Sequence, residues 1–283
     1  MKTRLTLSQQ STLLSLLLFA VILLVWQLAT LPDTPAAAAD VDPEYAALMG
    51  GGSASSASSF PQPAAMAQTL WEKLSDPFYD NGPNDKGIGI QLAYSLARVL
   101  SGFFLAAAVA IPLGFLIGNS RVFYDALNPY VQVLKPISPL AWMPLALYTI
   151  KDASLSAVFV IFICSLWPML INTAHGVANV KKDWLDVSRT LEVNPFRKAF
   201  RVILPAAAPT ILTGMRISMG IAWLVIVAAE MLVGGTGIGY FVWNEWNNLS
   251  ITNVLFAIFM IGIVGMALDS LFGVLGKRVA YQE

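Results

Sequence analysis

Long apolar blocks are the feature that most constrains what this chain can fold into. Five of them contain few charged side chains: Thr12–Leu31, Ala97–Gly118, Ser156–Thr173, Pro209–Leu232 and Asn253–Phe272. A helix needs roughly 20 mostly apolar residues to cross the hydrocarbon core of a bilayer, and each block meets or approaches that length. Only 12% of the residues are charged, which is about half the usual share in soluble domains. The sequence therefore predicts an all-α, polytopic membrane protein.

A sixth apolar segment, Pro136–Ile150, is shorter and contains Pro136, Pro139 and Pro144. Proline interrupts the hydrogen bonds of a helix, and unpaired backbone groups in lipid cost several kcal/mol each. We therefore expect this segment to be irregular or sheltered by neighbouring helices. With it, the chain has about six transmembrane helices.

Lysine and arginine set the expected orientation, because they are enriched in cytoplasmic loops. With the N-terminus inside, Lys73, Lys86 and Lys151 fall outside, while Arg98 and Arg216 fall within spans. The remaining twelve basic residues fall in cytoplasmic pieces: Lys2, Arg4, Arg121, Lys135, Lys181, Lys182, Arg189, Arg197, Lys198, Arg201, Lys277 and Arg278. This distribution predicts cytoplasmic N- and C-termini.

The N-terminal block, residues 1–31, has two interpretations. Lys2 and Arg4 before it and Ala36–Ala39 behind it are typical of a cleavable signal peptide. Its apolar run of about 20 residues exceeds the ~7–15 of a signal core, which favours a retained first transmembrane helix or uncleaved signal anchor.

Residues 32–90 are expected to form a periplasmic segment. Pro35–Ala67 is rich in Ala, Ser, Gly and Pro, which predicts a flexible linker. Gln68–Ser75 is expected to form a short interfacial helix, and the following "DPFYDNGPNDKGIG" has the composition of turns. The main transmembrane domain is then expected over residues 91–283.

The longest cytoplasmic loop, about residues 174–208, has helical patterning. Trp184, Val187 and Leu191 recur at helical spacing, and Phe196 and Phe200 are four residues apart. Two short amphipathic helices broken at Asn194-Pro195 fit this pattern. From the spacing alone, the loop is either an interfacial helix on anionic lipid or an element that docks in a groove of another protein.

Within this loop, "DVSRTLEVNPFRKAFRVILP" resembles the EAA loop of ABC-importer permeases. That pattern is Glu-Ala-Ala, three residues, Gly, nine residues, then Ile-x-Leu-Pro. The matching positions are Asp186, Val187 and Ser188 for the first part and Val202, Leu204 and Pro205 for the second. "RTL" after Ser188 matches the branch that includes nitrate, sulfonate, taurine and bicarbonate permeases, and "FYDNGPNDKGIG" and "VWNEWNNL" lean toward nitrate.

The glycine of the pattern is replaced here by Glu192. A left-handed backbone conformation at that position would be strained for glutamate. We therefore expect the turn to lie at Asn194-Pro195 instead.

The resemblance runs from about Trp71 to the C-terminus and implies a type I ABC importer permease fold. It implies a homodimer in the bacterial inner membrane that works with two ATPase subunits, which bind ATP and Mg, and with a periplasmic or lipid-anchored substrate-binding protein. The implied cargo is a small inorganic anion, nitrate or nitrite, for nitrate assimilation; bicarbonate, cyanate and alkanesulfonates such as taurine are the alternatives. The residues it implies for coupling to the ATPase are Trp184, Asp186, Val187, Ser188, Arg189, Leu191, Glu192, Asn194, Pro195, Leu204 and Pro205.

Other classes fit the sequence less well. The chain has no GxxxxGK[ST] phosphate-binding pattern, so we expect no cofactor and no catalytic residue in it, and ATP hydrolysis in partner subunits. A secondary transporter would show paired half-repeats with broken helices, which the sequence does not display. The net charge of +0 indicates no nucleic-acid partner. The single Cys164 and the single His175 predict no metal site, and both are expected to be packed in the ordinary way.

Four charged residues lie within predicted spans, where charges are costly and either paired or functional. By depth in the membrane, Arg98 is expected to pair with Glu230, and Arg216 with Asp269. Three roles are open for these residues. They form salt bridges that hold helices together, they attract an anion into the pathway, or they extend toward the lipid edge.

The segment Gly234–Gly239, "GGTGIG", follows a span rather than a strand, so it is not a dinucleotide-binding motif. It predicts a flexible outside turn. Trp243 and Trp246 behind it are suited either to the membrane interface or to docking of the binding protein.

Overall fold

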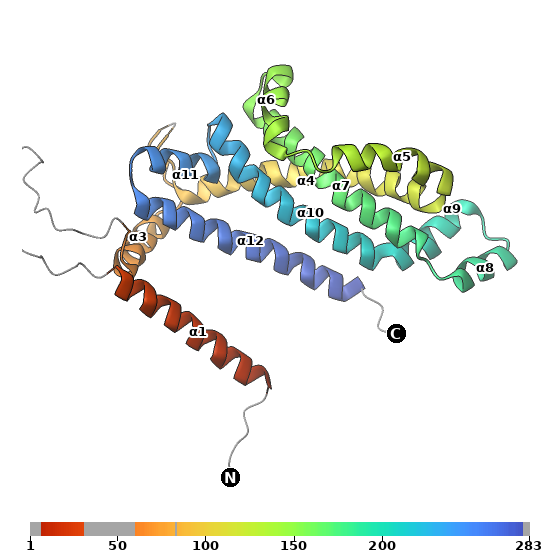
Figure 1. Cartoon of the computed structure of the whole chain (residues 1–283), viewed down its shortest axis with the longest axis horizontal. Coiled ribbons are helices and arrows are strands. Elements are labelled where there is room, and N and C mark those ends of the chain that lie inside the picture. Colours follow the sequence, from red (N-terminus) through yellow and green to blue (C-terminus); the bar gives the residue numbers. More distant parts are fainter. Residues whose placement is uncertain (1–6, 31–59, 83, 280–283) are drawn as a thin grey trace, which may run out of the picture. The chain divides into compact units, whose positions relative to one another are not determined.

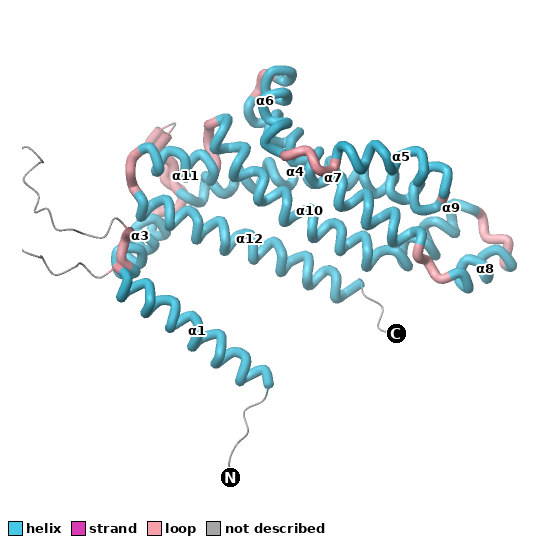
Figure 2. Tube along the Cα trace, in the orientation of Figure 1, coloured by secondary structure: helices cyan, strands magenta, loops and turns pink. Residues whose placement is uncertain are grey.

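The computed structural model describes residues 7–30, 60–82 and 84–279, and in these ranges the regular elements are all helices (Figures 1 and 2). Five are long and apolar enough to cross a membrane. They are α1 (Leu7–Ala29), α4 (Ile88–Asn119), α7 (Ala153–Ala178), α10 (Leu204–Val233) and α12 (Ile251–Val279). All five spans predicted from the apolar blocks are confirmed, and most extend beyond the predicted ends.

The chain divides into two compact units, described here separately. The first comprises the described parts of Met1–Ser75 together with Glu245–Phe256. In it α1 meets α3 (Pro63–Ser75), and the indole Nε1 of Trp26 donates to the carbonyl of Pro61 over 3.1 Å. The helix predicted from Gln68 thus begins earlier, because Pro63 occupies a first-turn position that proline favours. The flexible-linker prediction is therefore wrong for Pro63–Ala67, and residues 35–59 of that linker lie outside the described residues.

The second unit has α4, α7 and α10 packed against one another (Figure 1). Small residues on α4 allow this close approach. A Cβ atom added at Gly102 would lie 2.7 Å from Ile161 Cγ2, and one added at Gly114 would lie 2.6 Å from Thr173 Cβ. Ala106 and Ala110 on the same face are fully buried. Van der Waals packing through small residues therefore joins the helices of one subunit.

The sixth apolar segment forms α6 (Pro139–Ile150), and it is preceded by a helix that the apolar pattern did not reveal, α5 (Arg121–Leu134). α5 follows α4 after Ser120 and packs beside it (Figure 1). Lys135 therefore does not lie in a short loop with Arg121. It ends α5, at about 21 Å of helical rise from Arg121.

Turns precede α4, as the composition of residues 76–87 predicts. Asp80 and Lys86 form an isolated antiparallel bridge and a 3.0 Å salt bridge. The hydrogen bond from Lys86 lowers the pKa of the Asp80 carboxyl. α11 (Ile238–Asn247) forms the corresponding connection before α12.

The long loop between α7 and α10 contains α8 (Lys182–Thr190) and α9 (Pro195–Lys198), followed by a π-helical turn, Ala199–Ile203, that runs directly into α10. Pro205 has no N–H group to donate to the preceding turn. The wider turn accommodates this, since the N–H of Leu204 reaches back to the carbonyl of Ala199. The "ILP" motif therefore lies inside a continuous helical segment.

Candidate functional site

An exposed apolar stripe runs along α8, within the loop that resembles the EAA motif. Trp184, Val187 and Leu191 have 46%, 59% and 69% of their surface exposed. Helical spacing places all three on one side of α8 and its C-terminal end. Exposed apolar residues grouped in this way are typical of a surface that binds another protein.

The opposite side of α8 is attached to the helix bundle. Leu185 packs against a buried apolar cluster at the inner ends of α7 and α10, formed by Val177, Val180, Ile203, Ala207 and Ile211. Ser188 is buried, and its hydroxyl donates to the carbonyl of Leu185 over 2.7 Å. Leu185 therefore joins α8 to the cluster between α7 and α10.

The end of α8 corrects the expected position of the turn. Glu192 itself adopts the left-handed conformation, with φ of 47°. Its N–H donates to the carbonyl of Arg189 over 2.9 Å, and the N–H of Val193 donates to that of Ser188 over 3.1 Å. These two bonds form a Schellman motif, which stabilises the conformation that glutamate alone disfavours. The turn therefore occurs at the glycine position of the family pattern although glycine is absent.

Asn194 and Pro195 begin the next helix. The Oδ1 atom of Asn194 accepts from the N–H of Phe196 over 3.1 Å, and Pro195 occupies the first helical position. On α8, Arg189 and Asp186 form an exposed ion pair three residues apart, which contributes little to stability. Leu204 and Pro205 lie at the start of α10, directly after the buried Ile203.

Arg98 and Glu230 meet near the outer ends of α4 and α10. Arg98 Nη1 donates to Glu230 Oε1 over 2.7 Å and to the carbonyl of Thr236 over 2.7 Å, and its Nε donates to Ser154 Oγ over 2.9 Å. Ser95 Oγ lies 2.9 and 2.8 Å from the two carboxylate oxygens. Glu230 is only 2% exposed. A buried carboxylate satisfied in this way ties three helices together.

The end of the glycine-rich turn is part of this cluster, because the N–H groups of Gly237 and Gly239 are hydrogen-bonded to it. The N–H of Gly239 donates to Glu230 Oε2 over 3.0 Å, and the N–H of Gly237 donates to Gln91 Oε1 over 2.7 Å. A Cβ atom at Gly237 would lie 2.3 Å from the Glu230 carboxyl carbon. Gln91 and Ser95 were not anticipated, although polar residues within an apolar helix are a recognisable signal.

Arg216 and Asp269 meet on α10 and α12 in a two-pronged ion pair. Arg216 Nε donates to Asp269 Oδ1 over 2.6 Å, and Nη2 donates to Oδ2. Unlike the outer pair, these side chains are 48% and 55% exposed. They line an open hollow of about 570 Å³ together with Thr213, Ser270 and Lys277. The structure thus forms both pairs that membrane depth predicted, in two different environments.

The remaining candidates are partly or fully exposed. His175 lies exposed on α7, which corrects the expectation that it is packed in the ordinary way. The Nδ2 atom of Asn179, one helical turn further along, lies 3.1 Å from both ring nitrogens of His175. Cys164 is half-buried. Trp243 and Trp246 are exposed on α11. Among the described residues, no group of three His, Cys, Asp or Glu side chains could hold a metal ion.

Sequence comparison identifies close relatives. The chain is 46% identical over 226 residues to the nitrate import permease protein NrtB of Synechocystis sp.. The matched stretch covers 80% of this chain and 82% of the relative. The chain is 44% identical over 222 residues to NrtB of Leptolyngbya laminosa, covering 78% and 80%. It is also 43% identical over 208 residues to the bicarbonate transport system permease protein CmpB of Synechocystis sp., covering 73% and 74%.

Solved structures with the same fold are more distant in sequence. An inward-facing form of the MetNI methionine ABC transporter matches with a TM-score of 0.60 at 14% identity, over 66% of this chain and 94% of that one. An amino acid ABC transporter matches with a TM-score of 0.58 at 12% identity, over 76% and 97%. The fold is thus that of type I ABC importer permeases. Residues 110–281 match the family described as binding-protein-dependent transport system inner membrane component, and this chain belongs to that family.

Proposed function

We propose that this chain is the membrane-spanning permease of an ATP-driven importer for nitrate or nitrite. The observation that carries the proposal is the 46% identity to a nitrate import permease over 226 residues. The matched stretch is 80% of this chain, so the identity is not confined to the short motif common to the family.

The transport route lies between two copies of this chain, and two ATPase subunits bind the α8 loops. The exposed stripe of Trp184, Val187 and Leu191 supplies the contact with an ATPase groove. When ATP brings the ATPase subunits together, α8 moves, and Leu185 passes this movement to the apolar cluster below α7 and α10. A periplasmic or lipid-anchored binding protein delivers the anion at the opposite end.

This arrangement places the N- and C-termini and α8 in the bacterial cytoplasm, and α11 outside. The basic residues of the α8 loop support this orientation, since they are typical of cytoplasmic segments. The first helix, residues 1–31, is retained, residues 32–90 are periplasmic, and residues 91–283 form the transport domain.

Reconstitution in proteoliposomes tests the proposal. The chain is co-expressed with its ATPase and binding-protein partners and reconstituted. ¹⁵N-nitrate should accumulate on the side of the membrane that holds the ATPase subunits, and only when ATP is present on that side. Uptake driven by a proton gradient without ATP would contradict it and would indicate a secondary transporter. An intact, assembled complex that hydrolyses ATP yet carries no nitrate or nitrite would overturn the choice of anion.

Bicarbonate is the second candidate, because a bicarbonate permease shares 43% identity with the chain. Competition separates the two. Excess unlabelled nitrate should abolish labelled uptake, whereas excess bicarbonate should leave it unchanged. ATP-driven uptake of ¹³C-labelled bicarbonate that excess nitrate leaves unchanged would assign the importer to bicarbonate.

A pair of neighbouring substitutions tests the role of the α8 stripe. Leu191→Ser removes an apolar side chain whose full burial is worth about 1.5–3 kcal/mol, so ATPase binding should weaken roughly 10- to 100-fold. Thr190→Ser is the matched control on the same turn and should leave binding unchanged. Equal co-purification of the ATPase with both variants would exclude the stripe as the contact.

A further inference from the structure

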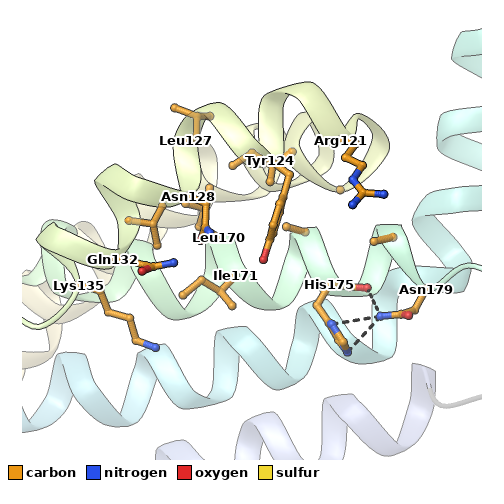
Figure 3. A pocket seen from close by; sticks show the side chains of 15 residues that line it. Arg121, Tyr124, Leu127, Asn128, Gln132, Lys135, Leu170, Ile171, His175 and Asn179 are labelled. Carbon is orange, nitrogen blue, oxygen red and sulfur yellow. Dashed lines mark hydrogen bonds between the residues drawn. The ribbon is translucent and has the colours of Figure 1, made fainter.

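A cavity of about 630 Å³ lies between α5, α7 and the end of α4 (Figure 3). α5 supplies one wall and the last three turns of α7 supply the other. In Figure 3, the Tyr124 ring extends from α5 toward α7, where His175 and Ile171 lie. The cavity belongs neither to the α8 stripe nor to either intramembrane ion pair.

The α5 wall of the cavity is a polar stripe. α5 also carries Asp125, one helical turn from Arg121, and Tyr130, and neither of these side chains lines the cavity. The polar residues on it are three or four positions apart, so they share one side of the helix: Arg121, Tyr124, Asn128, Gln132 and Lys135. Val122 and Val133, outside the cavity lining, are exposed. Across the cavity, α7 contributes His175 and Asn179 among apolar residues. Every polar group here can donate a hydrogen bond, and no carboxylate is present in the lining.

The two cations of this stripe differ from the two arginines within the long apolar helices. Arg98 and Arg216 each contact a carboxylate. Within the described part of the chain, neither Arg121 nor Lys135 forms an ion pair. Both are therefore available to a ligand.

Lys135 is an unpaired cation at the far end of α5 from α4. It lies about 21 Å of helical rise from Arg121, which closely follows the C-terminal end of α4. A cation within a membrane is costly and is retained where it faces a water-filled cavity or a pathway. The stripe thus forms a series of donors from the inner end of the bundle toward its middle.

We infer that this cavity binds the transported oxyanion on its way to the cytoplasm, an inference that rests on the proposed function. A small oxyanion accepts hydrogen bonds through all its oxygens. Arg121 offers a planar pair of donors and Lys135 a compact positive charge, while Asn128 and Gln132 offer neutral amide donors. The unpaired cations attract the anion, and the exposure of the cavity lets it leave.

Cysteine labelling in the assembled transporter tests this inference without requiring transport. Cys164 is first replaced by alanine, so that introduced thiols are the only ones in this chain. Gln132→Cys places a thiol in the cavity, and Val133→Cys is the matched control on the outer side of the same helix. Each is modified with a negatively charged and a positively charged methanethiosulfonate reagent, in nanodiscs of phosphatidylcholine only.

At Gln132→Cys the anionic reagent should react about tenfold faster than the cationic one, because unpaired positive charge raises its local concentration. Millimolar nitrate should slow that reaction severalfold. At Val133→Cys neither preference nor protection should appear. Adding Lys135→Met to Gln132→Cys should abolish both effects, while adding Lys135→Arg should preserve them, which separates loss of charge from loss of folding.

Equal rates for the two reagents at Gln132→Cys, or nitrate protection that survives Lys135→Met, would overturn the inference. Protection by added phosphatidylglycerol but not by nitrate would overturn it as well, and would assign the cavity to a lipid headgroup. These outcomes are distinct from failure of the proposed function. ATP-driven nitrate uptake without cavity protection would reject the site alone, whereas protection by bicarbonate but not nitrate, with no nitrate uptake, would reject the choice of anion.

Discussion

The two ion pairs within the helices have the same chemistry and opposite surroundings. Arg98–Glu230 is almost fully enclosed, with Glu230 2% exposed and its carboxylate held by Arg98, Ser95 and the Gly239 N–H. Arg216–Asp269 is about half exposed on both sides and has no comparable surrounding network among the described residues.

This difference in exposure indicates different roles for the two ion pairs. The outer pair joins elements 132 residues apart in the sequence and satisfies its own polar atoms, so it stabilises one subunit. The inner pair cannot face hydrocarbon in its exposed state, because lipid does not solvate charge. We expect it to face the water-filled route or the second copy of the chain.

The largest expected effect comes from leaving Glu230 buried without its cation. Arg98→Met should destabilise the subunit by about 3–5 kcal/mol, the typical cost of breaking a buried ion pair. Thermal or denaturant unfolding in detergent measures this. Arg216→Met is the matched substitution at the exposed pair and should change the unfolding midpoint far less. Equal losses would remove the distinction between the two pairs.

A smaller effect is expected from the hydroxyl that bridges the outer cluster. Ser95→Ala removes the group that bonds Glu230 and accepts from the Ile238 N–H over 2.9 Å. Loss of stability should be about 1–3 kcal/mol, as for other buried groups left unpaired. Ser101→Ala on the same helix is the control, since the Ser101 hydroxyl is exposed and bonds only the carbonyl of Ala97. An unchanged unfolding midpoint for Ser95→Ala would show that the cluster does not stabilise the fold.

The smallest effect on stability is expected at the inner pair, where transport is the informative measurement. Reversing one charge, by Arg216→Asp or Asp269→Arg, should reduce nitrate uptake while the subunit remains folded. The double exchange restores the pair with opposite polarity. Recovered uptake would support a pairing role, whereas continued loss would indicate that Arg216 acts on the anion directly.

Much of the fold followed from apolar length alone. The five long spans were predicted because crossing a bilayer requires about 20 apolar residues, which is a local property of the sequence. α5 was missed because its polar stripe interrupts the apolar run, so Arg121 and Lys135 resembled a loop. Average hydrophobicity does not identify a helix that has one polar side. Which side faces a cavity becomes clear only from the helices that pack around it.

The α8 loop shows the same limit at smaller scale. The motif spacing predicted its helices and its exposed stripe, since helical periodicity is local. The predicted position of the turn was wrong. A left-handed conformation is strained for glutamate, but two backbone hydrogen bonds at the end of α8 compensate this strain at Glu192. The hydrogen bonds from the end of the glycine-rich turn to Gln91 and Ser95 were likewise not predicted, because these partners lie more than 140 residues away.

By itself, the sequence determined the apolar spans, the family pattern in Asp186–Pro205 and the expected charge partners, since each depends on residue type and spacing along one chain. Only the tertiary structure decided which charges are buried, which are exposed and which form no ion pair among the described residues. The physical reason is that the electrostatic environment of a charge depends on distances to groups far away in sequence, and these distances exist only once the helices have packed.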